Sequence, residues 1–139
     1  MTASSEVIAE LSHRAREAAG HAYAPYSHFR VGAAVLARSG AVYVGCNVEN
    51  ASFGLTQCAE RAALTAAIAA GEPAGKLDCI VIYIPGETPH PPCGACRQVM
   101  EELMSPDSIL VSCCDTDEVR TWTVPEYLPD AFVPPDHFK

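Results

Sequence analysis

The chain has 139 residues and a formal net charge of −8, and 49% of its residues are hydrophobic, which suits one globular domain spanning residues 1–139. Its nine Lys and Arg residues are scattered, and an acidic surface without clustered positive charge argues against a nucleic-acid partner. No apolar stretch reaches the roughly 18 residues of a membrane span, and the first ten residues lack a secretory pattern, so we expect a cytoplasmic protein without membrane contact.

The pattern of apolar residues, turns and helix stops predicts helices and strands that alternate along the chain. Gly20 and Gly71 each follow a segment with helical periodicity, and Ser39-Gly40 is typical of a hairpin turn. In chain order we expect a helix over 5–19, strands over 29–36 and 42–46, a helix over 56–70, a strand over 79–84, a helix over 93–104, strands over 109–114 and 119–123, and a short helix over 125–128. This order predicts an α/β fold with a mixed sheet, helices packed against it and right-handed crossovers.

The second predicted helix is rich in alanine, and such small side chains allow another helix to approach closely. The alanines are at positions 59, 62, 63, 66, 67, 69 and 70. Packing within the chain and packing between copies of a homo-oligomer explain this pattern equally well.

Two short segments, each at the predicted start of a helix, carry residues suited to binding a metal. Cys93 and Cys96 are one helical turn apart, so their sulfurs face the same way, and Cys58 would add a third ligand from the neighbouring helix. Helix N-termini favour thiolates, and three protein ligands with an open position are typical of catalytic zinc. Glu60 lies two residues after Cys58, where it could move protons at the metal's water.

Other interpretations of these cysteines remain open at this point. Cys93 and Cys96 alone could form a redox pair, although that function would not require Cys58 and Glu60. A closed structural zinc site could recruit a fourth ligand from Cys46, Cys79, Cys113 or Cys114. A disulfide framework is disfavoured, because the seven cysteines are odd in number and no export signal accompanies them.

Four longer motifs are spread over most of the sequence. They are Tyr-Ala-Pro-Tyr-Ser-His-Phe-Arg-Val-Gly-Ala-Ala at 23–34, Asn-Val-Glu-Asn-Ala-Ser-Phe-Gly at 47–54, Cys-Ala-Glu-Arg at 58–61 and Pro-Cys-Gly-Ala-Cys-Arg-Gln at 92–98. The two cysteine segments fit the zinc-deaminase signature in its three-cysteine form. With these motifs, the sequence resembles the small, homotetrameric, zinc-dependent cytidine deaminases over most of its length. The resemblance implies the three-layer fold of that family with a five-stranded sheet, one zinc ion per chain and deamination of cytidine and 2′-deoxycytidine within pyrimidine salvage.

The resemblance also implies the roles of residues outside the metal site. Asn47 and Glu49, at alternate positions after a strand, would hold the ribose 3′-hydroxyl, although an Asx turn would also explain Asn47. Phe29 would pack against the pyrimidine ring, the alternative being a core aromatic, and Ala59 would contact the substrate. Phe53 and Phe132 would reach the sites of neighbouring subunits. Their alternatives are a loop anchor for Phe53 and a C-terminal core plug for Phe132.

Arg61 follows the proposed proton carrier and is expected to offset the negative charge of three thiolates, unless it only caps the helix or pairs with a carboxylate. Two positions depart from the family pattern, since Pro91 replaces a common serine and Phe53 a common tyrosine. Two other functions stay open: deamination of a modified cytosine nucleoside, such as an aminoacyl-nucleoside antibiotic, and a non-catalytic module stabilised by zinc.

Overall fold

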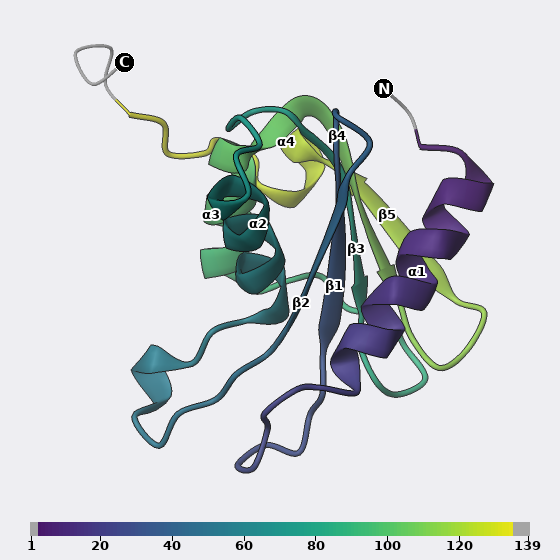
Figure 1. The fold of residues 1–139 in the computed structure, drawn as a ribbon, viewed down its shortest axis with the longest axis vertical. Helices are drawn as coiled ribbons and strands as arrows, with labels where there is room; N and C mark the ends of the chain where they lie inside the picture. The colour runs from purple at the N-terminus through teal and green to yellow at the C-terminus, as the bar shows by residue number, and fades with distance from the viewer. Residues whose placement is uncertain (1–2, 135–139) are drawn as a thin grey trace.

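The computed structural model describes residues 3–134. Its elements, shown in Figure 1, follow the predicted order, with one added 3-10 turn, η1. They are α1 (Ser5–Ala19), β1 (Gly32–Ala37), β2 (Val42–Cys46), η1 (Phe53–Leu55), α2 (Ala59–Ala69), β3 (Leu77–Tyr83), α3 (Gly94–Leu103), β4 (Met104–Cys113), β5 (Val119–Thr123) and α4 (Val124–Tyr127). Of the helices in this part of the chain, none is both long enough and apolar enough to cross a bilayer.

The five strands form one mixed sheet in the order β2-β1-β3-β4-β5. The β1–β2, β1–β3 and β4–β5 pairs are antiparallel, whereas β3 and β4 are parallel. The parallel pair lies at the centre and its strands are almost entirely buried, as their continuous apolar runs predict. The predicted mixed five-stranded sheet is therefore confirmed.

Helices cover both faces of the sheet and make three layers, as Figure 1 shows with α1 on one side and α2, α3 and α4 on the other. On the first face, Leu11 and Ala15 of α1 pack with Val81 and Val111 of the central strands. The other face has the larger cluster, which includes Leu64 of α2. The Ala-rich α2 thus turns Ala59, Ala63 and Ala67 toward the sheet of its own chain.

The first strand begins later than its apolar pattern predicts. The predicted strand starts at Phe29, whereas β1 starts at Gly32. His28 has a φ of 58°, which bends the chain before the strand. The side-chain amide of Asn47 then donates to the carbonyl of Phe29 and accepts from the N–H of Val31. These side-chain hydrogen bonds take the place of the backbone hydrogen bonds that a neighbouring strand would make there.

The second helix also begins later than predicted, at Ala59 rather than at Thr56. Gln57 pairs with Val48 through two backbone hydrogen bonds of 2.9 Å, which keeps this segment extended. Cys58 becomes the residue that precedes the first helical turn. The bounds of α1, β2 and β5 are those predicted, and the remaining bounds differ by one or two residues. The exception is β4, which starts five residues early because Met104 pairs with Leu77.

Candidate active site and metal centre

Three cysteine sulfurs converge where α2 and α3 begin. Cys58 and Cys93 are the N-caps of the two helices, and Cys96 lies in the first turn of α3. Their sulfur atoms all lie within 4.8 Å of one another. Around tetrahedral zinc, with a Zn–S bond of ~2.3 Å, sulfurs would be about 3.8 Å apart. Three thiolates at this spacing fit zinc and leave one coordination position for a non-protein ligand.

The four remaining cysteines lie elsewhere. Among residues 3–134, the three sulfurs form the only group of at least three His, Cys, Asp or Glu side chains close enough to share a metal. Cys79 is fully buried. The Cys113 thiol donates to the carbonyl of Ile82, and Cys114 lies 3.2 Å from the hydroxyl of Thr116. This arrangement favours an open three-cysteine site over a closed four-cysteine one.

Glu60 places a buried carboxyl group beside the sulfur cluster. The residue is 6% exposed, and its Oε2 accepts a hydrogen bond of 3.5 Å from the thiol of Cys96. Burial raises the pKa of Glu60, because a charged carboxylate loses its hydration there. A carboxyl group with a raised pKa can both accept and return a proton near neutral pH, as a general acid–base catalyst must.

Arg61 binds the sulfur cluster from the side of α2. Its Nη2 donates to the Cys58 sulfur over 3.2 Å, a contact between residues three apart at a helix start. Hydrogen bonds from the Cys96 thiol and from Arg61 lower the pKa of the Cys58 thiol to about 5. The Cys58 interaction in turn raises the pKa of Arg61. The guanidinium therefore stays charged and favours the thiolate that a metal requires.

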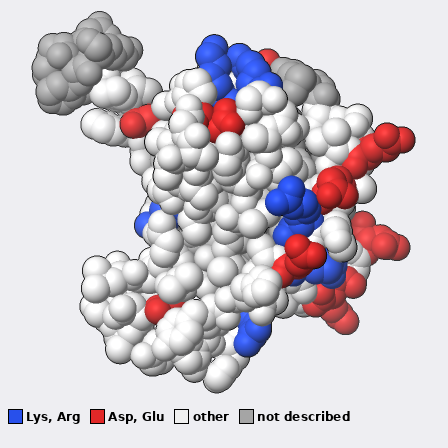
Figure 2. Space-filling model, in the orientation of Figure 1, with Lys and Arg blue, Asp and Glu red and all other residues white. Residues whose placement is uncertain are grey.

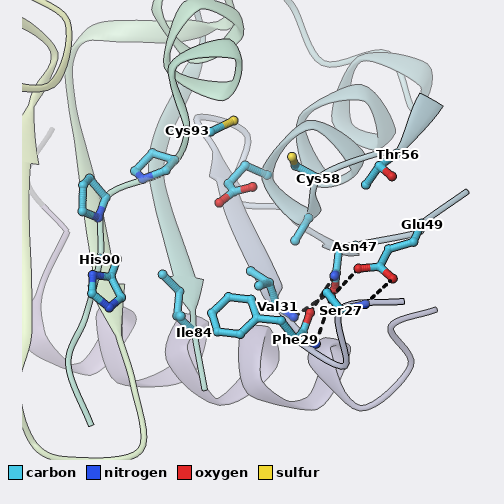
Figure 3. Close-up of a pocket in the computed structure, with 14 residues that line it drawn as sticks. Ser27, Phe29, Val31, Asn47, Glu49, Thr56, Cys58, Ile84, His90 and Cys93 are labelled. Atoms are coloured by element: carbon cyan, nitrogen blue, oxygen red, sulfur yellow. Dashed lines mark hydrogen bonds between the residues drawn. The ribbon is translucent and has the colours of Figure 1, made fainter. Parts of the chain in front are cut away.

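A pocket of about 600 Å³ opens in front of the sulfurs. Its lining comprises Ser27, Phe29, Val31, Asn47, Glu49, Thr56, Cys58, Ala59, Glu60, Ile84, His90, Pro91, Pro92 and Cys93. Figure 3 shows Asn47, Ser27 and Glu49 on one side, His90 and Ile84 on the other, and Phe29 between them. The volume lies within the range of small-molecule sites.

The polar side of the pocket is fixed by hydrogen bonds. Asn47 accepts from the N–H of Val31 at 2.9 Å and donates to the carbonyl of Phe29 at 2.8 Å. The Glu49 carboxylate accepts from the backbone N–H groups of Tyr26 and Ser27 and from the Ser27 hydroxyl. The Ser27 hydroxyl bond and the backbone bonds lower the pKa of Glu49, which keeps it ionised.

The family model for the cytidine and deoxycytidylate deaminase zinc-binding region matches residues 5–112, which include the three cysteines of the sulfur cluster and every residue that lines the pocket. The chain belongs to this deaminase family. The chain is 47% identical over 117 residues to a cytidine deaminase of Halalkalibacterium halodurans, a match that covers 83% of this chain and 86% of that protein.

Solved structures of cytidine deaminases share the fold. A crystal structure of cytidine deaminase from Burkholderia pseudomallei is 48% identical, with a TM-score of 0.86, and the match covers 89% of this chain and 98% of that one. The enzyme from Mycobacterium tuberculosis is 38% identical with a TM-score of 0.74, covering 91% and 97% of the two chains. The predicted family, its fold and its zinc cofactor are thereby confirmed.

The structure places four of the six expected substrate contacts in the pocket of this deaminase chain. Phe29, Asn47, Glu49 and Ala59 line it. Phe29 is 44% exposed, so it is a wall of the pocket rather than a core aromatic. Asn47 makes tertiary contacts to the 29–31 segment instead of a local Asx turn.

The two remaining aromatic residues lie outside the pocket of their own chain. Phe53 and Phe132 are each 73% exposed. The Phe53 ring packs edge-to-face with the Tyr26 ring, with ring centroids 5.8 Å apart. The carbonyl of Phe132 accepts from Gln98. Neither is buried as a loop anchor or core plug would be.

Sequence reasoning assigned no role to several residues that line the pocket, among them Ser27, Thr56, Ile84 and His90. Ser27 lies within a motif that carries the family resemblance. Its hydrogen bond to Glu49 joins residues far apart in the sequence, so the spacing of residues could not predict it. His90 lies in the segment Pro89-His90-Pro91-Pro92, whose sequence contains no motif that would indicate a ligand contact. Only the packing of this loop beside the pocket gives His90 a position at the site.

Proposed function

We propose that this protein hydrolyses cytidine and 2′-deoxycytidine to uridine and 2′-deoxyuridine with release of ammonia. Membership of the family and the names of the relatives support this reaction. The observation that carries it is the buried Glu60 carboxyl beside the three sulfurs at one end of a nucleoside-sized pocket. We infer that one domain carries both the metal and the substrate site and acts in cytoplasmic pyrimidine salvage.

In this proposal Cys58, Cys93 and Cys96 hold one zinc ion. Zinc at such a site supplies a Lewis acid that lowers the pKa of water. Glu60 carries a proton to N3 of the pyrimidine and later to the departing amine. Its raised pKa suits both directions of transfer, since the group must be protonated in one step and ionised in the next. Arg61 stabilises the Cys58 thiolate throughout.

The remaining side chains orient the nucleoside. Phe29 packs against the base, and Ala59 contacts it from the first turn of α2. Asn47 and Glu49 bind the 3′-hydroxyl of the sugar, because the Asn47 amide and the Glu49 carboxylate each keep hydrogen-bonding capacity beyond the bonds they make. No residue in this set addresses the 2′-position, so ribose and deoxyribose should both be accepted.

The test is a panel of free cytidine, 2′-deoxycytidine, 2′-deoxycytidine 5′-monophosphate and an aminoacyl-cytosine nucleoside, with ammonia release and bound zinc measured on the same protein. We expect rapid turnover of the first two compounds and one zinc per chain. Turnover of the aminoacyl compound alone would favour a modified-nucleoside deaminase. Bound zinc with no turnover of any compound would favour the non-catalytic module.

We further propose that the enzyme is a homotetramer whose sites are completed across subunits. The loops that carry Tyr23, Tyr26, Phe53 and Leu55 expose large apolar side chains, with 48–73% of each accessible. Figure 2 shows charged groups gathered over α1, whereas the lower face formed by the 20–31 and 47–57 loops is mostly uncharged. Such an apolar patch is typical of an interface.

Sedimentation velocity at the enzyme's working concentration tests the assembly. We expect a single species with four times the chain mass. We also expect Phe53→Ala to lower the affinity for cytidine, because the neighbouring subunit's site loses an aromatic wall. An active monomer would contradict the proposal while leaving the deamination reaction intact.

A further inference from the structure

One wall of the pocket is apolar apart from a single imidazole. Ile84, His90, Pro91 and Pro92 form this wall. Prolines have no N–H to donate, and Ile84 has an apolar side chain. The His90 imidazole makes no hydrogen bond or ion pair with any residue between 3 and 134. Its two ring nitrogens are thus available to a ligand.

The backbone around His90 is held in place. Pro89 is fully buried, and prolines at 91 and 92 restrict the chain that follows. The Ser112 hydroxyl of β4 donates to the carbonyl of His90 over 2.8 Å. The loop therefore presents an exposed side chain from a constrained backbone, which limits the entropy lost when the side chain meets a ligand.

His90 faces the pocket from the side opposite the sugar-binding pair, with Phe29 between them (Figure 3). It precedes Cys93 by three residues on the loop that leads into α3, whereas Glu60 follows Cys58 on α2. In the orientation that the proposed reaction requires, C4 of the cytosine lies at the sulfurs and N3 lies toward Glu60. The opposite edge of the ring, which carries C5, would then face the wall that contains His90.

We propose that His90 is a specificity-determining residue that selects cytosine nucleosides bearing an oxygen-containing substituent at C5. This inference rests on the proposed function, since it takes the orientation of the base from that reaction. A neutral imidazole has one donor and one acceptor nitrogen, and a hydroxymethyl group can satisfy either one. A C5 methyl group reaches the same wall but forms no hydrogen bond.

The experiment compares cytidine, 5-methylcytidine and 5-hydroxymethylcytidine as substrates of the zinc-loaded enzyme and of two variants. His90→Leu removes the hydrogen bond and keeps an apolar side chain of similar size. His90→Gln keeps a donor and an acceptor. The readout is kcat/KM for each substituted nucleoside divided by kcat/KM for cytidine, because a general disturbance of the fold affects all three substrates alike.

We expect His90→Leu to lower the 5-hydroxymethyl ratio about fivefold, which corresponds to one ordinary hydrogen bond. The 5-methyl ratio should stay the same or rise, and His90→Gln should keep most of the hydroxymethyl preference. Equal 5-hydroxymethyl ratios in wild type and His90→Leu would overturn the proposal, as would a parallel fall of both ratios.

Failure of the proposed function would give a different result. A wild-type protein that releases no ammonia from cytidine would contradict the deaminase proposal. Calorimetric Kd values for cytidine and 5-hydroxymethylcytidine then decide the role of His90. A preference for the hydroxymethyl compound that disappears in His90→Leu would support that role, and an unchanged Kd ratio would exclude it.

Discussion

Gly45 of β2 lies against Ala63 of α2 so closely that a Cβ atom on Gly45 would be 2.5 Å from the Ala63 backbone nitrogen. The same Cβ would be 2.6 Å from the carbonyl oxygen of Ala59. Both partners are backbone atoms, which cannot swing aside as a flexible side chain can. The missing side chain at position 45 therefore sets how close the first turn of α2 sits to the sheet.

We expect Gly45→Ala to displace α2 and with it Cys58 and Glu60. Overpacking of this kind costs about 1–3 kcal/mol of folding free energy, and kcat/KM should fall as well. Urea unfolding and steady-state kinetics measure the two effects. Gly54→Ala is the matched control for stability, because a Cβ there meets no atom within 4 Å. Equal unfolding free energies in both variants would contradict the close approach.

Glu60→Gln should abolish most of the activity while the fold and the metal are kept. The glutamine side chain has nearly the same shape as glutamate but cannot carry a proton from water to the pyrimidine ring. General acid–base catalysis is worth ~10²–10⁴-fold, and because one group serves several steps the loss should reach the top of that range or exceed it. Ammonia release measures it, with the exposed Glu102→Gln as control. Near-normal turnover in Glu60→Gln would refute the role.

Single alanine substitutions should divide the seven cysteines into two groups. Loss of Cys58, Cys93 or Cys96 should release zinc, since each sulfur belongs to the cluster. Loss of Cys46, Cys79, Cys113 or Cys114 should leave zinc bound. Metal analysis of the folded proteins decides this, with circular dichroism confirming that each variant is folded. A folded variant of the second group without zinc would show that the site has a fourth protein ligand.

Arg61→Gln should keep much of its zinc and lose activity. Three thiolates and one Zn²⁺ sum to a net charge of −1, and the guanidinium at 3.2 Å from Cys58 offsets it. Cys58→His in the same chain removes one negative charge, so the double variant should regain part of the activity. Turnover per bound zinc is measured for both single variants and the double variant. Strictly additive losses would show that Arg61 does not act through the charge of the cluster.

The paired Asp78 and Arg38 should make stability depend on pH. Asp78 is 1% exposed and accepts two hydrogen bonds from Arg38, at 2.8 and 3.3 Å. The Arg38 hydrogen bonds lower the pKa of Asp78 below its usual value. A lowered pKa means that the folded state binds protons more weakly than the unfolded state, so the stabilisation is present above about pH 4 and is lost as the pH falls further.

Arg38→Gln tests this pair. We expect Arg38→Gln to lower the free energy of unfolding at pH 7, by less than the loss of a partner from a fully buried pair would, because the Arg38 side chain is 45% exposed. The difference from wild type should shrink as the pH falls below about 4, because protonation of Asp78 removes the negative charge that Arg38 stabilises. Urea unfolding across this range measures it, with the exposed Asp117→Asn as control. A difference that stays constant with pH would contradict the ion pair.

Local patterns predicted the parts of this molecule that depend on neighbouring residues in the chain. The helix over 5–19 and the strand over 42–46 have the predicted bounds, because periodicity and stop signals define them. The sulfur cluster was predictable for the same reason, since Cys93 and Cys96 are one helical turn apart. Its third member, Cys58, needed the further inference that two helix starts lie side by side.

The errors arose where distant segments decide the local structure. The residues just before Cys58 are extended because Gln57 pairs with Val48. The helical propensity of the residues around position 57 contains no information about that distant pairing. Likewise, β1 starts late because the Asn47 side chain holds the backbone of Phe29. The wall containing His90 is a tertiary arrangement of a loop against a strand, so a single sequence gave no sign of it.

The two bonds of the Asn47 amide have a consequence for affinity. They fix the rotamer of a buried side chain during folding, so the conformational entropy of that side chain, ~1 kcal/mol, is lost before a nucleoside arrives. The carboxylate of Glu49 is restrained in the same way by Ser27. A sugar would therefore meet a preorganised pair of groups, and binding would lose little further entropy on the protein side.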